Sequence, residues 1–535
     1  MKKLFLVPLL FFPVLVALVF EYNFCRFDLS RYENFAEGLL FGILLFGIIS
    51  LFKIGRIRTI IFIIAFILFT LVTWLESGFY YLYEVNFNPS TIYILLETNI
   101  SEASEFLSSY INATLVIFTA IMFVPLAIII PFIIRHIRFF SWFISPPKIY
   151  KRILIAIIGV TGIIATLKFT GIIVQNLPYL FVKTSIQYAE QTGSYDDLGL
   201  TDKIGNFKNS IRKRSENNET FVIVIGESQT RHKMSLYGYD RATNPKLEAI
   251  KDELVIFDDV ISPSTYTIES LEKALTMANY EDSTAIYKGS MIQLFNSVGF
   301  KTYWISNQRP VGINENLLTK IASAADESVF VNISNYNMIT SFDGELLKPV
   351  QDALDDEYPK KVLFVHLLGN HIDYNKRYPK QFEVFKTFDD KYQEIEDIID
   401  AYDNATVYND FIVSEIIEKL RRKNDESYML YFSDHGEEVY ETQDEYGHFL
   451  GDASKPMYDI PFVLWQSDEF KKNRPIRFRT HREYMIDDLI HSVGHLSNIK
   501  WDGYEAKRSV FSIYFKKRIR HIMGDINYNK LYKFD

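Results

Sequence analysis

Five long apolar stretches dominate the first third of the chain, and shorter apolar runs alternate with helical patterns in the remainder. The long stretches lie near residues 4–20, 36–52, 59–75, 112–134 and 153–174. Each approaches the length that a helix needs to cross a hydrocarbon core of roughly 30 Å. We therefore predict an N-terminal transmembrane domain of five helices over residues 1–175.

Charged residues between these stretches predict their orientation. Lysine and arginine occur before the first stretch and in the second and fourth connections, whereas residues 76–111 have neither and carry five glutamates. The positive-inside rule then places the amino terminus in the cytoplasm and everything after the fifth helix outside it. A cleaved signal peptide is the alternative for residues 1–20, but Glu21, Tyr22 and Asn23 form no small-residue cleavage site, which favours an uncleaved anchor.

Beyond the apolar third, the pattern becomes that of a soluble α/β domain. Residues 176–220 are polar and of mixed charge, which predicts a membrane-proximal linker. Short runs rich in β-branched and aromatic residues then alternate with helical patterns; they are FVIVIG (221–226), LVIFDDVI (254–261), KTYWISN (301–307), KVLFVHLL (361–368), YMLYFS (428–433) and IPFVLW (460–465). The alternation predicts a mostly parallel central sheet covered by helices, over residues 221–535.

Composition excludes several classes of site. The formal net charge of −9 offers no basic footprint for nucleic acid, and no nucleic-acid-binding motif is present. Cys25 is the only cysteine, so the outer domain has no internal disulfide and no cysteine-bound zinc. A domain of this size must depend on its own apolar core.

Residues able to bind a metal follow three of the predicted strands. Glu227 ends the first, His371 follows the fourth, and Asp434 with His435 follows the fifth. Because ligands of open α/β sheets bind at the carboxyl ends of the strands, these side chains can converge on one site. Each has a structural alternative, such as a carboxylate at a helix N-terminus for Glu227. Together they predict a site for zinc or a similar divalent ion.

A hydroxyl cluster and a further histidine add to this set. SPSTYTIES, residues 262–270, precedes a helical pattern, where a hydroxyl can cap the helix or act as a nucleophile beside free backbone amides. His448 follows a turn-like segment. Considered alone, it could also be a structural histidine held by hydrogen bonds. Carboxylates, histidines and a hydroxyl, without cysteine, are the groups expected around a metal ion that activates a hydroxyl for phosphoryl transfer.

Several ordered motifs together resemble a known family. They are VIVIGESQTRHKMSLYGYDRATNP (222–245), STYTIES (264–270), TYWISNQ (302–308), HLLGNHIDYNKRYP (366–379), YDNATVYNDF (402–411) and YFSDHGEE (431–438). With five membrane spans, they resemble the membrane-bound phosphoethanolamine transferases of Gram-negative envelopes, in the sulfatase-like branch of the alkaline phosphatase superfamily. The resemblance implies a sulfatase-like fold for the outer domain.

The resemblance also implies roles for individual residues. Thr267 aligns with the nucleophilic threonine, and Glu227, Asp434 and His435 align with the ligands of a catalytic zinc ion, which Thr267 would complete. The segment lacks the cysteine-containing flanks of the relatives that modify lipid A, which leaves Thr265 as an alternative nucleophile.

Three further residues take substrate-binding roles by the same resemblance. His371 and His448 match the histidines that contact the transferred phosphate or a second zinc ion, and one of them could protonate the leaving group. Asn307 is a candidate for the donor pocket.

The function that the resemblance implies is transfer of phosphoethanolamine from phosphatidylethanolamine to an envelope acceptor, with release of diacylglycerol. The enzyme would be a multi-pass protein of the bacterial inner membrane with its C-terminal catalytic domain in the periplasm. Its acceptor would be lipopolysaccharide core, lipid A, or another periplasmic glycan or protein, and the cysteine-free domain favours the core. The alternatives are a glycerophosphate transferase of the lipoteichoic acid synthase type and an inactive membrane scaffold or sensor.

Overall fold

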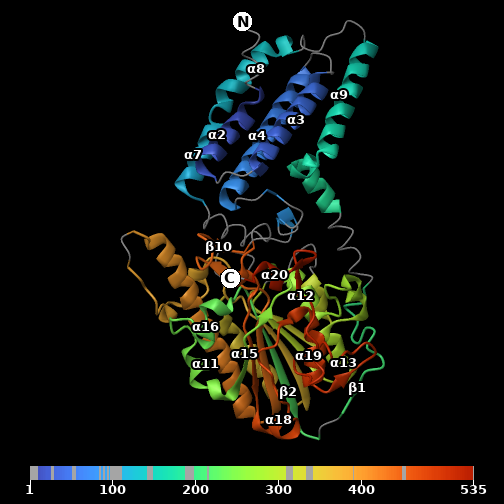
Figure 1. Cartoon of the computed structure of the whole chain (residues 1–535), viewed down its shortest axis with the longest axis vertical. Helices are drawn as coiled ribbons and strands as arrows, with labels where there is room; N and C mark the ends of the chain where they lie inside the picture. The colour runs from blue at the N-terminus through green and yellow to red at the C-terminus, as the bar shows by residue number, and fades with distance from the viewer. Residues whose placement is uncertain are drawn as a thin grey trace. The chain divides into compact units, whose positions relative to one another are not determined.

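The computed structural model divides the chain into two compact units, Met1–Glu190 and Gln191–Asp535. It describes residues 10–25, 29–50, 56–83, 86–87, 91–92, 95–96, 111–140, 149–186, 198–213, 216–308, 317–332, 341–388, 391–448 and 453–533. In Figure 1 the colour of the first unit runs from blue to blue-green, and that of the second from green to red.

The first unit is helical. Its helices include α2 (Phe12–Phe24), α3 (Leu29–Ser50), α4 (Arg56–Tyr83), α7 (Ala113–Phe123), α8 (Leu126–Phe140) and α9 (Ile149–Phe169). Each predicted apolar stretch overlaps at least one of them. Among the described residues, however, only Thr59–Leu82 and Ala113–Phe132 are both long and apolar enough to cross a membrane. The count of five membrane helices therefore stays a prediction.

Polar contacts join these helices within the apolar unit. Ser77 on α4 donates a hydrogen bond of 2.6 Å to Glu21 on α2, and Asn176 donates one of 2.5 Å to Glu37 on α3. Both glutamates are buried. Such pairing is expected, because a buried polar group without a partner costs free energy.

The second unit is built on a seven-stranded sheet in the order β3-β11-β8-β2-β7-β5-β6. The strands are β2 (Glu219–Gly226), β3 (Leu254–Phe257), β5 (Lys301–Ser306), β6 (Glu327–Phe330), β7 (Lys360–His366), β8 (Glu426–Ser433) and β11 (Phe462–Gln466). All neighbouring pairs are parallel except the two that involve β11. The prediction of a mostly parallel central sheet is confirmed.

Side chains of β2 alternate between two apolar cores, one on each face of the sheet. Phe221, Ile223 and Ile225 pack in one core, and Val222 and Val224 in the other. The first core is covered by α12 (Thr267–Leu275), α13 (Met291–Ser297) and α19 (Leu489–Leu496), and the second by α11 (Pro245–Ala249), α15 (Leu347–Asp355) and α16 (Gln393–Lys423) (Figure 1). A strand buried on both faces explains why this run is apolar throughout.

Part of the segment predicted to be a linker, residues 176–220, belongs to the folded second unit. Leu200 and Phe207 are buried in the core beneath α13. Gln293 of α13 donates hydrogen bonds to the backbone oxygens of Gly199 (2.7 Å) and Asp202 (2.8 Å). The folded domain therefore extends to the amino-terminal side of residue 221.

Two strands depart from the predicted pattern. The run LVIFDDVI is divided into β3 and a short β4 (Val260–Ile261), which pairs with β12 (Tyr484–Met485) outside the central sheet. The edge strand β6 was not predicted, because its residues are largely exposed and form no apolar run.

Candidate active site

The register of β2 and β8 places two acidic residues side by side. The strands pair along their whole length, ending with Gly226 opposite Ser433. Glu227 directly follows β2 and Asp434 directly follows β8, and both side chains are almost completely buried. Two distant parts of the sequence thus meet at the carboxyl edge of the sheet, as predicted for an open α/β fold.

The backbone around Glu227 is tightly constrained. Ser228 has a φ of 54°, and its amide donates to Asp434 Oδ1 at 3.1 Å. Gly369, after β7, has a φ of 53°, and a Cβ there would come within 2.8 Å of the Glu227 carbonyl oxygen. Left-handed conformations of this kind persist where the surrounding structure enforces them, and they are common at functional sites.

His435 completes a group of three metal-capable side chains. Its Nε2 lies 3.3 Å from Glu227 Oε1 and 3.4 Å from Asp434 Oδ2. One ligand atom from each residue lies within 4.8 Å of the other two. His435 Nδ1 lies 2.8 Å from the Gly436 carbonyl oxygen, which can only accept. Nδ1 therefore carries a proton, and Nε2, which faces both carboxylates, is the atom that a bound metal would take as its ligand.

His435 is the basic side chain that lies beside the two carboxylates. Within the described residues, neither Glu227 nor Asp434 has an ion pair with lysine or arginine, and Asp434 Oδ2 is buried without a hydrogen bond. Burial, and next Glu227, raise the pKa of Asp434 to about 6. Burial alone would lower the pKa of His435, but Asp434 and Glu227 outweigh it and raise that pKa to about 10.

A divalent cation fits this arrangement. It would remove the repulsion between the carboxylates and bind the buried Asp434 Oδ2, which accepts no hydrogen bond from the described residues. Two carboxylates and one imidazole are ligand types of catalytic zinc sites, which keep a fourth position open.

Thr267 lies beside these ligands, at the first position of α12. Its Oγ1 is 3.1 Å and 3.3 Å from the two carboxylate oxygens of Glu227 and 3.5 Å from His435 Nε2. Its side chain is half-buried, whereas Thr265 is completely buried. This geometry favours Thr267 over Thr265 as the nucleophile.

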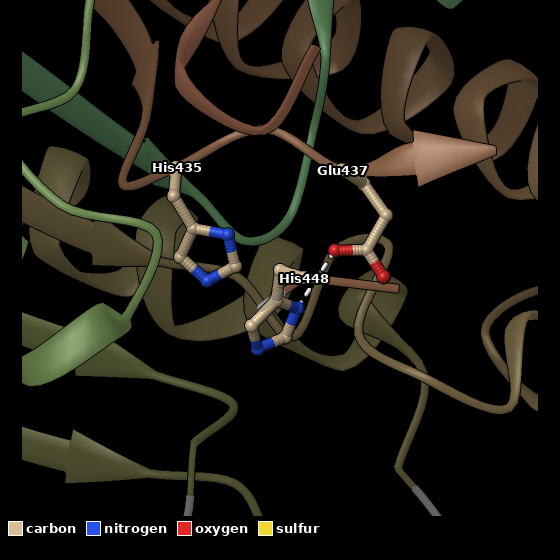
Figure 2. A group of neighbouring side chains, drawn as sticks. All are labelled: His435, Glu437 and His448. Carbon is tan, nitrogen blue, oxygen red and sulfur yellow. Dashed lines mark hydrogen bonds and ion pairs between the residues drawn. The ribbon is translucent and has the colours of Figure 1, made fainter. Parts of the chain in front are cut away.

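A second group joins His448 to the same site, as Figure 2 shows. The rings of His435 and His448 are 4.5 Å apart between centroids, and His448 Nδ1 lies 2.8 Å from Glu437 Oε2. Tyr374 donates a 2.6 Å hydrogen bond to the other oxygen of Glu437. Neither Glu437 nor Tyr374 was predicted, although Glu437 directly follows the Asp434-His435-Gly436 turn and could have been considered.

Two predicted residues lie outside these groups. His371 is half-buried in the loop after β7, and no metal-capable group in the described part of the chain includes it. Asn307 is buried, and its amide nitrogen donates to Asp343 (2.8 Å) and to the Ser341 carbonyl (2.9 Å), so it joins two loops. The following residue, Gln308, donates to Glu227 at 3.2 Å and was missed. The substrate-binding roles of His371 and Asn307 stay predictions.

Comparison with known proteins agrees with this geometry. Residues 219–499 match the family model of the sulfatases. The chain is 33% identical over 487 residues to phosphoethanolamine transferase EptC of Escherichia coli K12, covering 85% of this chain and 83% of that protein.

Two solved structures are similar. The C-terminal periplasmic domain of E. coli EptC in complex with zinc has a TM-score of 0.57 and 36% identity, and the match covers 60% of this chain and 94% of that domain. The integral membrane protein EptA, the lipooligosaccharide phosphoethanolamine transferase of Neisseria meningitidis, has a TM-score of 0.68 at 19% identity and covers 94% and 98% of the two chains.

The strand ends, the metal-capable group, the adjacent threonine and these similarities all agree. The chain belongs to the sulfatase family and, within it, to the metal-dependent phosphoethanolamine transferases.

Proposed function

We propose that this enzyme transfers phosphoethanolamine from phosphatidylethanolamine to an acceptor of the Gram-negative envelope through a phosphorylated Thr267. The contact that carries the proposal is the Thr267 hydroxyl, 3.1 Å from Glu227 within a buried group of metal ligands. Lipopolysaccharide core is the preferred acceptor because the catalytic domain has no cysteine, unlike the relatives that modify lipid A. Lipid A and other periplasmic glycans or proteins are the remaining acceptor classes.

Glu227, Asp434 and His435 would hold one zinc ion. When bound there, zinc would lower the pKa of the Thr267 hydroxyl and offset the negative charge of the phosphoryl oxygens. The crystallised relative that contains zinc supports this choice of metal. The first-turn backbone amides of α12 add a favourable electrostatic environment for the same charge.

The reaction has two displacements at phosphorus. In the first, Thr267 Oγ1 loses its proton and bonds to the phosphorus of the donor, the bond to the diacylglycerol oxygen breaks, and that oxygen takes up a proton. In the second, an acceptor hydroxyl or phosphate oxygen bonds to the phosphorus, the bond to Thr267 breaks, and the threonine regains its proton. His448, beside His435, and His371 are the proposed contacts to the phosphoryl group and leaving oxygen.

The helical unit gives the enzyme access to substrates anchored in a membrane. We propose that residues 1–175 cross the inner membrane five times and that the catalytic domain, residues 221–535 with the segment 176–220 before it, lies in the periplasm. Sharing one bilayer surface with donor and acceptor raises the effective concentration of both. The membrane protein EptA and the periplasmic domain of EptC support this arrangement.

Release of fluorescent diacylglycerol tests the donor and the nucleophile. Full-length protein in detergent micelles would be incubated with fluorescent phosphatidylethanolamine or, separately, phosphatidylglycerol. Release from phosphatidylethanolamine alone is expected, with complete loss in Thr267→Ala and retention in Thr265→Ala. Release only from phosphatidylglycerol would instead support a glycerophosphate transferase. No release from either lipid would support a scaffold.

The acceptor requires a separate measurement. Mass spectrometry of envelope glycolipids from cells with and without the active enzyme should reveal an added phosphoethanolamine group. Its location on core sugars would support the preferred acceptor, and its location on lipid A would replace it.

A further inference from the structure

Both carboxylate oxygens of Glu437 are engaged by side chains at the candidate site. Oε2 lies 2.8 Å from His448 Nδ1, and Oε1 accepts a 2.6 Å hydrogen bond from the Tyr374 hydroxyl. Glu437 is completely buried, and Tyr374 is held edge-on against Tyr402 at 5.0 Å. The carboxylate is therefore fixed on both sides.

A short hairpin brings Glu437 and His448 together. Strand β9 (Glu438–Val439) pairs with β10 (Tyr446–Gly447), and Gly447 lies opposite Glu438. Glu437 and His448 are the next residues along this ladder, so the backbone places their side chains within reach of each other. Because a carboxylate only accepts hydrogen bonds, His448 Nδ1 must carry a proton. Figure 2 shows the second ring nitrogen of His448 pointing away from Glu437.

Another histidine in the same domain shows how a purely structural pair differs. His232 Nδ1 lies 2.7 Å from Glu441, but its Nε2 is also engaged, 2.7 Å from Asp459. His448 is fixed through Nδ1 alone, and its Nε2 has no hydrogen-bond partner among the residues that the structure describes. One histidine is locked at both nitrogens, and the other presents a nitrogen at the site.

We propose that Glu437 is a positioning residue, which orients His448 so that Nε2 faces the phosphoryl group at Thr267, and that Tyr374 holds Glu437 in place. The ring centroids of His448 and His435 are 4.5 Å apart, so the His448 ring lies beside one of the candidate metal ligands. The inference rests on the proposed function, because it assigns Glu437 to the same reaction. Glu437 acts through His448 and contacts no substrate.

A double-mutant cycle tests this dependence. Full-length wild type, Glu437→Ala, His448→Ala and the double variant would be compared by diacylglycerol release from fluorescent phosphatidylethanolamine. Each single variant should lower kcat about 100-fold, the lower range for a positioned proton-transfer group. If Glu437 acts through His448, the double variant should be no slower than His448→Ala. A further loss of about 100-fold in the double variant would overturn the proposal.

Smaller changes keep the test decisive if Glu437→Ala does not fold. Glu437→Gln preserves the shape of the side chain and one hydrogen-bond acceptor, so a loss of roughly tenfold in kcat is expected. Tyr374→Phe removes a single hydrogen bond, so a loss of roughly threefold is expected. Neither substitution should lower kcat further when His448 is already alanine. Glu441→Gln is the matched control, because it weakens the His232 pair and should leave kcat unchanged. Zinc content should match the wild type in the Gln and Phe variants, and both variants should melt as folded proteins, with at most a small fall in melting temperature from the lost hydrogen bond.

The two possible failures give different results. If wild type releases diacylglycerol but the fold-losses in kcat from the Glu437 and His448 substitutions multiply in the double variant, only the positioning role is wrong. If wild type releases none, the proposed function fails and this inference fails with it. A fall in zinc content that parallels the loss of activity would assign Glu437 to metal binding and also overturn the positioning role.

Discussion

The two ends of the β2–β8 strand pair carry the same kinds of residue and yet differ in character. At the amino end, Glu219 lies opposite Glu426, and directly after the carboxyl end come Glu227 and Asp434. All four carboxylates are almost completely buried. The difference lies in what surrounds them.

At the amino end, arginines neutralise both carboxylates. Arg212 donates to Glu219 at 2.8 Å, and Arg474 bonds to Glu219 and lies 2.6 Å from Glu426. At the carboxyl end, the described residues pair neither carboxylate with lysine or arginine; the partners are His435, the Thr267 hydroxyl, the Gln308 amide and backbone amides. A buried acidic pair with basic partners is a complete structural unit, whereas one without them favours a bound cation. A structural acidic pair and the proposed metal-binding pair thus share the two strands.

The largest expected effect is at the carboxyl end. Asp434→Asn should abolish zinc binding and lower the rate of diacylglycerol release by at least about 1,000-fold, which corresponds to about 4 kcal/mol of lost transition-state stabilisation. The metal-free variant should melt no lower than metal-free wild type, because the substitution removes one of two repelling charges. Zinc analysis and melting curves would measure both. A large drop in the melting temperature would mean that Asp434 is structural.

At the amino end of the β2–β8 pair, a substitution should lower stability and leave zinc binding unchanged. Arg474→Ala leaves Glu219 and Glu426 with less compensation, and loss of one partner of a buried ion pair costs about 3–5 kcal/mol. The melting temperature should fall sharply, while zinc content per folded molecule stays unchanged. Arg477→Ala is the matched control, since Arg477 is exposed in the same segment. Equal effects of the two substitutions would contradict the comparison.

Removal of zinc should lower the stability of the protein only when the carboxyl end of the β2–β8 pair has its metal ligands. Chelation should destabilise the wild type by about 2.7 kcal/mol when free zinc had been 100-fold above its Kd, and added zinc should restore the melting temperature. Arg477→Ala should respond like wild type, and Asp434→Asn should not respond. A response in Asp434→Asn would place the ion elsewhere.

A smaller effect, on the pH dependence of protein stability, is expected from His232. Burial would lower its pKa, but Asp459 and Glu441 raise it to about 9, above the ordinary value of 6.5. The stability from this pair is therefore fully present below about pH 6.5 and is lost as the pH rises through 9. Because the side chain is partly exposed, we expect on the order of 1 kcal/mol. Melting temperatures of wild type should fall between these pH values, and His232→Gln should flatten that part of the curve.

Sequence patterns predicted the elements of the catalytic domain well because these patterns are local. The apolar runs at 221–226 and 428–433 became central strands, since strands buried on both faces need continuous apolar side chains. The edge strand β6 escaped detection because it has little buried surface to impose a pattern. The ligand types could also be predicted, since Glu227 and the pair Asp434 and His435 stand directly at strand ends.

The sequence by itself determined the fold class, the residue types at the site and, through its motifs, the family. Tertiary structure decided which of them meet. Three features depend on contacts between residues 11 to 168 positions apart: the position of Thr267 beside Glu227 and His435, the link from Glu437 to His448, and the contact of Gln308 with Glu227. Such contacts follow from strand register and loop paths, which no local pattern specifies. The same dependence separates the two acidic pairs of β2 and β8, because only the fold brings Arg212 and Arg474 to one end and, among the described residues, pairs no lysine or arginine with the carboxylates at the other.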